Sequence, residues 1–382
     1  MKALWALILL LSAGACIGAE RLSESELNIV RSFTPPALPL TDTTNQYAEN
    51  PAAKKLGKQL FFDARLSSNG KVSCATCHDF SQSLVDGKTL AAGVGIGSRN
   101  TPTLINAAMQ RWFFLDGRAD SLWLQAIGPI ESKLEMGGSW QKVHRLFIND
   151  KKLLTAYNSV FTQTPLLPKV PYFKMDKNRF KVNVGKAIAA FEMDLIQFNS
   201  RFDHYVNAVV NGEENQNILN ANELRGLKVF IGKGRCIQCH SGANFSDGEF
   251  HNIRLMAAVK KPQDSGRYGV INSLKQNPLN TLGAYSDDVT VGKTQYLQQS
   301  EAQWAAFKTP TLRNIALTAP YMHDGSMATL RHVIEHYSTF ANAAPDHHKN
   351  PLLMPLNLTD AEITDLEAFL KTLSGTITLP TY

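Results

Sequence analysis

Long hydrophobic runs are scarce in this chain of 382 residues. The clearest run covers residues 3–15, and it is too short to span a membrane as a helix of the mature protein. No later run is long enough to cross a bilayer, so we expect no transmembrane segment in the mature chain. Runs of one charge sign and low-complexity tracts are also missing. The net charge of +6 is mild and the basic residues are scattered, which argues against a nucleic-acid partner.

The N-terminal run has the features of an export signal. Lys2 places a positive charge before the apolar residues, and Ala19 is the small residue expected before a cleavage site. We therefore expect residues 1–19 to be a signal peptide and the protein to be periplasmic or at the cell surface. Cys16 follows three small residues and offers an alternative, in which the exported protein is a lipoprotein anchored at this cysteine.

Cysteine is rare, with five in the chain, and each one outside the leader belongs to a C-x-x-C-H motif at residues 74–78 or 236–240. This motif is typical of c-type haem attachment, because two such thiols can add to the two vinyl groups of one porphyrin and the next residue offers an imidazole to the iron. Chance matches, zinc sites and disulfide pairs are disfavoured by the confinement of these cysteines to the motifs. We predict two covalent haem c groups, held by Cys74, Cys77 and His78 (haem 1) and by Cys236, Cys239 and His240 (haem 2).

The apolar pattern predicts a mainly α fold with two cytochrome c-like haem domains. We place an N-terminal extension at residues 20–50, the first haem domain at 51–215 and the second at 216–382. Similar lead-ins with a glycine precede both motifs, which indicates a weak internal repeat. Helical spacing over residues 184–210 predicts one helix that joins the halves. Capping-box patterns predict helix starts at Ser23 with Glu26 and at Thr359 with Glu362.

Three further stretches are RNTPT at residues 99–103, LDGRAD at 115–120 with the segment that follows to 137, and the segment from KTPTLRN to HDG at 308–325. With the haem motifs, they resemble the bacterial di-haem cytochrome c peroxidase and MauG family over nearly all of the mature chain. The resemblance implies a haem 1 that reacts with peroxide and a haem 2 that transfers electrons. It also implies a calcium ion between the domains, held by the Asn100 side chain, the carbonyls of Thr318 and Pro320, and water.

The open face of haem 1 decides whether peroxide can bind. Family peroxidases often carry a distal histidine in the loop after the first motif, whereas residues 91–98 read AAGVGIGS here. We therefore expect haem 1 to be five-coordinate or water-bound in the resting ferric state. Glu135 and Gln125 match the family's catalytic distal pair, and Pro129 matches the residue that shapes the pocket. Glu135 would move a proton between the peroxide oxygens.

In the peroxidase branch, haem 2 takes a methionine ligand fourteen residues after the histidine of the HDG stretch. That histidine is His323 here, and the matching residue is Tyr337. Tyr337 shares a helical face with Leu330 and Ile334, which favours an inward position. We expect Tyr337 to ligate haem 2, because a phenolate favours ferric iron whereas methionine raises the reduction potential. Alternative ligands outside the matched position are Met322, Met327 and Met354.

Two positions depart from the family. Leu115 occupies the place of a tryptophan that lies between the haems as an electron relay, and Trp112 and Trp123 are nearby substitutes. Gly234 replaces a tryptophan on the route from MauG to its substrate. These departures put the relay and the MauG substrate in doubt.

These residues favour a hydrogen-peroxide-dependent oxidoreductase of the MauG-like (MbnH-like) branch with a tyrosine haem ligand. Peroxide would oxidise both haems to a high-valent state, and the enzyme would then oxidise a side chain of an exported protein partner. The alternative is a cytochrome c peroxidase that takes electrons from a small cytochrome c or a cupredoxin. A third possibility, an electron carrier without catalysis, would require six ligands at both haems.

Overall fold

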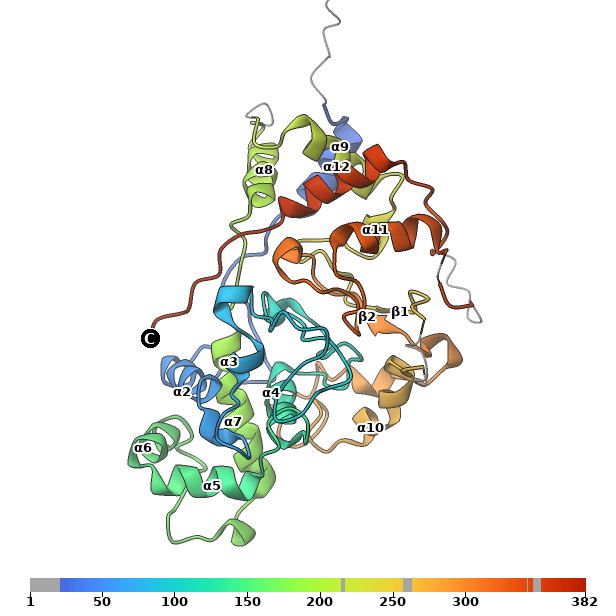
Figure 1. The fold of residues 1–382 in the computed structure, drawn as a ribbon. Coiled ribbons are helices and arrows are strands. Elements are labelled where there is room, and N and C mark those ends of the chain that lie inside the picture. Colours follow the sequence, from blue (N-terminus) through green and yellow to red (C-terminus); the bar gives the residue numbers. More distant parts are fainter. Residues whose placement is uncertain (1–20, 214–216, 257–262, 342, 346–351) are drawn as a thin grey trace, which may run out of the picture.

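A computed structural model describes residues 21–213, 217–256, 263–341, 343–345 and 352–382, so the predicted signal peptide and Cys16 lie outside the described residues. The described chain is mainly α, as predicted (Figure 1). Its α-helices are α1 (Glu24–Arg31), α2 (Pro51–Phe61), α3 (Cys74–Cys77), α4 (Leu122–Glu131), α5 (Trp140–Asn149), α6 (Lys151–Val160), α7 (Lys177–Glu192), α8 (Arg201–Val210), α9 (Ala221–Ile231), α10 (Ile271–Gln276), α11 (Leu330–Thr339) and α12 (Asp360–Lys371). Two short strands, β1 (Phe250–His251) and β2 (Phe307–Lys308), pair antiparallel.

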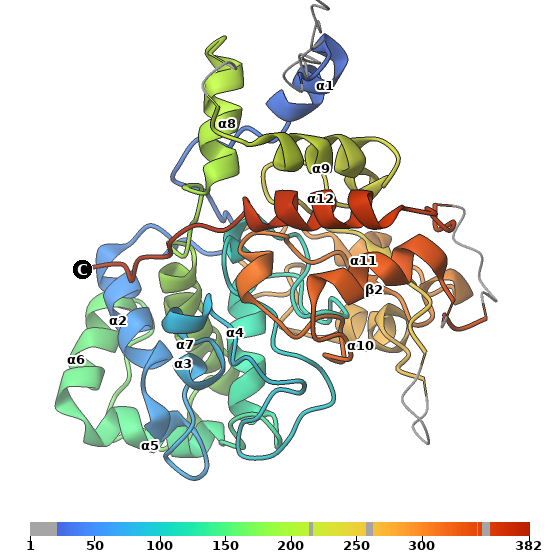
Figure 2. The ribbon, with the colours of Figure 1, turned by 45° about the horizontal axis from the view of Figure 1, so that its top comes forward.

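Buried apolar side chains form two cores. The helices that carry them belong to two lobes of the ribbon (Figures 1 and 2). The first core contains residues of α2 and of α4 to α7, and the second contains residues of α1, α8, α9, α11 and α12. Leu27 and Val30 of α1 therefore pack in the second lobe, although α1 comes first in the chain. Leu274 and Leu279, from the C-terminal half, pack in the first core. The predicted domain limits stay a prediction. Two segments cross them, because α1 packs in the second core and the segment with Leu274 and Leu279 packs in the first.

The prediction of one helix over residues 184–210 is wrong. α7 ends at Glu192 and α8 begins at Arg201, with irregular chain between them. Ser200 and Asp203 form a capping box, in which the Ser200 nitrogen donates to Asp203 Oδ2 at 2.8 Å and starts a new helix. The break lets the chain leave the first core and enter the second. The capping boxes predicted at Ser23 and Thr359 are present.

The lead-in helices α2 and α9 pack in the same way in the two lobes. A Cβ atom on Gly57 of α2 would lie 1.8 Å from the carbonyl oxygen of Ala187 on α7. A Cβ atom on Gly226 of α9 would lie 1.9 Å from the carbonyl oxygen of Asp365 on α12. Both glycines thus permit a close crossing between helices that a side chain would prevent. This shared packing supports the predicted internal repeat.

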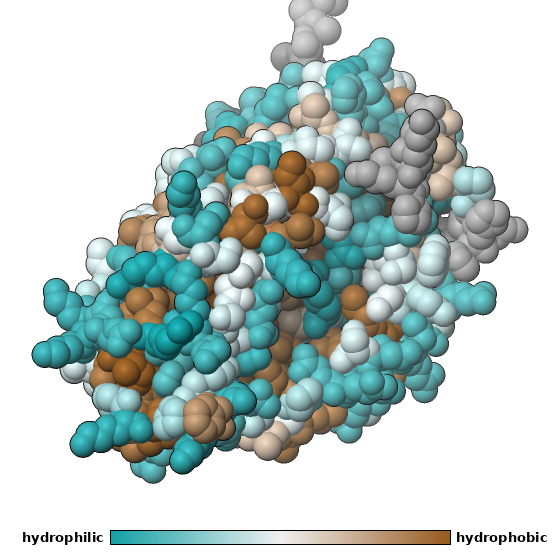
Figure 3. Space-filling model, turned by 60° about the horizontal axis from the view of Figure 1, so that its bottom comes forward, coloured by the Kyte–Doolittle hydropathy of each residue, from teal (hydrophilic) through white to brown (hydrophobic). Residues whose placement is uncertain are grey.

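The surface is mostly hydrophilic on the face shown in Figure 3, where apolar side chains gather in separate patches. None of the helices in the described part of the chain combines the length and the apolar composition needed to cross a membrane.

Candidate active site

One large cavity contains every site residue predicted from the sequence. Both C-x-x-C-H motifs contribute to its wall, from the start of α3 and from the segment after α9. The predicted residues that line it are Cys74, Cys77, His78, Asn100, Gln125, Pro129, Glu135, Cys236, Cys239, His240, Thr318, Pro320 and Tyr337. The fold therefore brings together side chains that are far apart in the sequence, although their individual roles remain predictions.

The two motif histidines have matching hydrogen-bond partners. His78 Nδ1 lies 3.0 Å from the carbonyl oxygen of Leu84, and His240 Nδ1 lies 2.9 Å from that of Phe245. An Nδ1–H that donates to a carbonyl leaves Nε2 as the nitrogen that can ligate iron. Burial lowers the pKa of both imidazoles, which keeps them in the neutral form that binds a metal. These carbonyl partners were not identifiable from the sequence.

The four motif cysteines are half-buried free thiols, and neither pair forms a disulfide. Among the described residues, one trio of side chains is close enough to hold a metal ion, and it consists of Cys239, Asp247 and His251. This trio omits Cys236, so it is not a zinc site built on both thiols of a motif. Paired free thiols with an adjacent imidazole along a cavity wall fit covalently attached haem.

The predicted peroxide-binding side of haem 1 is formed by α4 and the segment after it. Gln125 lies on α4, and its Oε1 atom is buried without a hydrogen-bond partner among the described residues. Glu135 is 34% exposed, and its Oε1 atom lies 3.9 Å from Arg118 Nη2. Burial raises the pKa of Glu135, and Arg118 partly opposes this effect. The site thus combines a free acceptor with a carboxyl group whose protonated form is favoured by burial, a combination that suits proton transfer.

The predicted second ligand of haem 2 lies on α11. Tyr337 lines the cavity together with Leu330, Val333 and Ile334, in agreement with the helical face expected from the sequence. Burial raises the pKa of Tyr337, so its phenolate requires a stabilising cation such as ferric iron. Met322 and Met354 also contribute to the cavity wall, and ligation by Tyr337 stays a prediction.

The predicted calcium ligands lie along the same cavity. The Asn100 side chain donates through Nδ2 to the carbonyl oxygen of Lys88 at 2.7 Å, which leaves Oδ1 as the atom available to a cation. The backbone nitrogen of Asn100 donates to the carbonyl oxygen of His323 at 2.8 Å and ties the first half of the chain to the second. This arrangement is compatible with a cation between the halves.

Two polar side chains at the cavity were missed by the sequence analysis. Glu192, the last residue of α7, is buried, and its Oε2 atom has no hydrogen-bond partner among the described residues. Burial raises the pKa of Glu192 to about 8. Lys308 is buried, its Nζ atom donates to Gln110 Oε1 at 2.7 Å, and burial lowers its pKa to about 8. A buried ammonium group suits a carboxylate such as a haem propionate. The sequence feature that could have identified Glu192 as a buried site residue is its position inside an apolar run.

No tryptophan of the described residues lies at the cavity wall, where the electron relay was expected. Trp123 is fully buried in the first core, and its Nε1 atom donates to Thr44 Oγ1 at 3.0 Å. Trp112 packs beneath the Arg267 guanidinium, whose carbon lies 4.3 Å from the ring centroid. Leu115 lines the cavity instead, as does the stacked pair formed by His323 and Phe307. The suggestion that Trp112 or Trp123 substitutes as the relay therefore gains no support.

Comparisons with known proteins identify the family. The family model for di-haem cytochrome c peroxidase matches residues 51–211. The methylamine utilization protein MauG of Methylorubrum extorquens is 34% identical over 335 residues, which cover 86% of this chain and 81% of that protein. A cytochrome c551 peroxidase of Nitrosomonas europaea is 32% identical over 329 residues, with coverage of 86% and 81%. The crystal structure of a MauG-like protein associated with microbial copper homeostasis is 26% identical, has a TM-score of 0.68, and is matched over 90% of this chain and 93% of that one.

These relatives carry both names, MauG and cytochrome c peroxidase, so the comparisons identify the broad activity and not its branch. The two haem motifs, the helical fold and the matched length agree with them. The chain is an oxidoreductase that belongs to the di-haem cytochrome c peroxidase and MauG family.

Proposed function

We propose that this protein is a peroxide-dependent oxidoreductase of the MauG type, which delivers oxidising equivalents from hydrogen peroxide to a side chain of an exported protein partner. The observation that carries the proposal is Tyr337, which shares the cavity with His240 in the place where the peroxidase branch has methionine. A phenolate ligand disfavours reduction of haem 2, so this haem is suited to hold an oxidising equivalent and not to accept electrons from a carrier.

The residues around haem 1 support peroxide cleavage. When bound, the two haems would together supply the two electrons that cleavage of the O–O bond requires, one from each haem. The unpaired Gln125 Oε1 accepts a hydrogen bond from a peroxide O–H group. The Glu135 carboxylate would take a proton from one peroxide oxygen and return it to the other, so that the second oxygen can leave as water. Arg118 stabilises the ionised form of Glu135, and Pro129 restricts the space beside it.

The exit path to the partner differs from that of MauG. Gly234 lies at the cavity wall, and a Cβ atom there would lie 2.7 Å from the carbonyl oxygen of Val229. A tryptophan at this position would require the backbone to move. We therefore propose that the protein substrate is not that of MauG and that oxidation leaves by another route.

A calcium ion and an exported location complete the proposal. Asn100 Oδ1 and the carbonyls of Thr318 and Pro320 are oxygen donors, which calcium prefers. Export fits covalent haem attachment and the leader at residues 1–19, with lipidation at Cys16 as the alternative.

The second candidate is a cytochrome c peroxidase that uses electrons from a small cytochrome c or a cupredoxin. The presence of Met354 at the cavity favours it, because a methionine ligand would raise the potential of haem 2. The 32% identity to the peroxidase of Nitrosomonas europaea is compatible with it.

Spectroscopy on the all-ferric holoprotein separates the two candidates. One equivalent of peroxide is added without reductant, and EPR and Mössbauer spectra are recorded before and after. Loss of both ferric signals and the appearance of high-valent iron at both haems is the result expected of the MauG type. A protein that reacts only after haem 2 has been reduced is a conventional peroxidase, and our proposal would then be withdrawn.

A further inference from the structure

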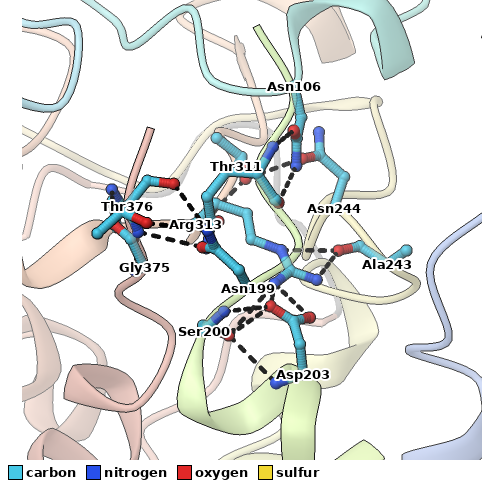
Figure 4. A network of polar contacts seen from close by, with 12 residues as sticks. Asn106, Asn199, Ser200, Asp203, Ala243, Asn244, Thr311, Arg313, Gly375 and Thr376 are labelled. Carbon is cyan, nitrogen blue, oxygen red and sulfur yellow. Dashed lines mark hydrogen bonds and ion pairs between the residues drawn. The ribbon is translucent and has the colours of Figure 1, made fainter. Parts of the chain in front are cut away.

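The second lobe contains an ion pair that is buried to an unusual degree. The Arg313 side chain is fully buried and Asp203 is 1% exposed. Arg313 Nη1 donates to both carboxylate oxygens of Asp203 at 2.6 Å (Figure 4). Two buried charges are costly to desolvate, and they are tolerated when geometry and further hydrogen bonds compensate. The remaining hydrogen bonds of this pair indicate which part of the chain it holds in place.

The other donors of Arg313 hold the loop that follows the second haem motif. Its Nε and Nη2 atoms donate to the carbonyl oxygen of Ala243 at 2.9 and 2.6 Å (Figure 4). Ala243 lies between His240 and Phe245, and the Phe245 carbonyl accepts the hydrogen bond from His240 Nδ1. Thr311 Oγ1 also donates to Asn244 Oδ1 at 3.1 Å. The chain between the histidine and its acceptor is thus anchored from outside at two consecutive residues.

The carboxylate of the ion pair is itself held firmly. Ser200 donates to Asp203 Oδ2 through its backbone nitrogen at 2.8 Å and through its hydroxyl group at 2.6 Å. These bonds form the capping box of α8, which packs in the second core. Arg313 therefore connects the His240 loop to a rigid helix start and not to a mobile surface chain.

The corresponding loop of the first lobe has no such charge. The segments TPTLIN (101–106) and TPTLRN (309–314) match in the sequence, and the position of Arg313 is occupied by Ile105, which is fully buried. The loop after His78 is anchored by a neutral contact, in which Thr103 Oγ1 donates to the carbonyl oxygen of Ser83 at 2.7 Å. The buried ion pair therefore supports the loop of the haem 2 motif and has no counterpart, among the described residues, at the loop of the haem 1 motif. Haem 1 can thus serve as an internal control in measurements on haem 2.

We propose that Arg313 and Asp203 are positioning residues for haem 2, which hold the Phe245 carbonyl against His240 Nδ1. A firm N–H···O=C bond gives a ligating imidazole more anionic character, and this stabilises the more oxidised iron. The pair thus lowers the reduction potential of haem 2 without touching the haem. The inference rests on the proposed function only for the assignment of His240 as the ligand of haem 2.

The test uses Arg313→Lys in the holoprotein without any peroxide. Lysine keeps the charge beside Asp203 but cannot make the forked contact to Ala243. We expect a positive shift in the midpoint potential of haem 2, a changed low-spin EPR spectrum of that haem, and an unchanged haem 1. Arg225→Lys is the matched control, because Arg225 pairs with Asp365 between α9 and α12 in the same lobe at a more exposed site. It should leave both haems unchanged.

A milder variant keeps the test decisive if Arg313→Lys fails to assemble. Thr311→Val removes the hydroxyl group that donates to Asn244 and accepts from the Arg313 backbone nitrogen at 3.0 Å, with little change in shape. It should shift haem 2 in the same direction by a smaller amount. Unchanged potentials and EPR spectra in a folded variant with both haems, or equal shifts of both haems, would overturn the inference. Because no peroxide is added, failure of the proposed function would leave these readings intact and would be recognised separately.

Discussion

The backbone nitrogen of Val94 donates a hydrogen bond to the carbonyl oxygen of Glu135 at 2.8 Å. Its neighbour Gly95 makes the same kind of contact with the carbonyl of Leu134 at 2.9 Å. The loop that lacks a distal histidine is therefore bound along its backbone to the segment that carries the predicted proton-transfer residue. Glu135 depends on this loop for its position, and residues 91–98 of the loop contain no histidine, methionine or lysine.

Gly93 permits the loop to approach Glu135, and Gly93→Ala tests this dependence. The new Cβ atom would lie 2.1 Å from the Glu135 carbonyl oxygen, so the segment must move. Overpacking of this kind costs about 1–3 kcal/mol of stability. We expect a slower reaction with peroxide in stopped-flow measurements. Gly97→Ala in the same loop is the control, because its nearest contact would be 3.3 Å. Equal rates in the two variants would contradict the coupling.

Glu135→Gln should slow the first reaction with peroxide by about 10²–10⁴-fold, the usual contribution of a positioned acid–base group. Burial raises the pKa of Glu135, so its carboxylate is protonated at a higher pH than an ordinary one. The wild-type rate should therefore fall as the pH drops through that raised pKa, and the variant should lose this acid limb. Glu131→Gln is the control, since Glu131 lies at the exposed end of α4 and pairs with Lys181. An unchanged pH profile in Glu135→Gln would exclude the role.

Tyr337→Met should convert haem 2 toward the conventional peroxidase. A thioether ligand favours ferrous iron, so we expect a higher midpoint potential and a requirement for prior reduction before peroxide reacts. Redox titration and stopped-flow measurements check both points. Tyr321→Phe is the control, because Tyr321 lies at the same cavity but donates its hydroxyl hydrogen to the Ile315 carbonyl at 2.9 Å. If Tyr337→Phe leaves the haem 2 spectrum unchanged, tyrosine is not the ligand.

Glu192 should make stability depend on pH. Its pKa is raised from 4.5 to about 8 in the folded protein, so the folded state retains a proton that the unfolded state has lost. Stability should therefore fall as the pH rises between these values, by up to about 1.4 kcal/mol per pH unit. Glu192→Gln should flatten this slope in urea unfolding of the holoprotein, whereas Glu131→Gln should not. A slope that survives Glu192→Gln must come from other groups.

Removal of calcium tests the site at Asn100. We expect Asn100→Ala to weaken calcium binding at least tenfold in calorimetric titrations and to change the spectra of both haems, because the ion would join the two halves. Asn222→Ala, at an exposed position of α9, should bind calcium like the wild type. If a chelator leaves the wild-type spectra unchanged and no calcium is found in the protein, the calcium prediction is wrong.

Local patterns explain which features were predictable. The C-x-x-C-H motifs, the capping boxes and the face of α11 that carries Tyr337 all depend on residues a few positions apart. Periodicity failed over residues 184–210, because the apolar spacing continues through a break that the capping box of Ser200 and Asp203 introduces. The spacing in that region records burial in two different cores and not one continuous helix.

The sequence by itself determined the two candidate haem attachment motifs, the helical class and the candidate side chains, because haem motifs and helical periodicity involve residues only a few positions apart. Only the tertiary structure decided which distant groups meet. It placed the carbonyls of Leu84 and Phe245 on the two histidines and α1 in the second lobe. It also buried Arg313 against Asp203, 110 positions away. Such contacts depend on how helices and loops pack in three dimensions, and no local pattern encodes them.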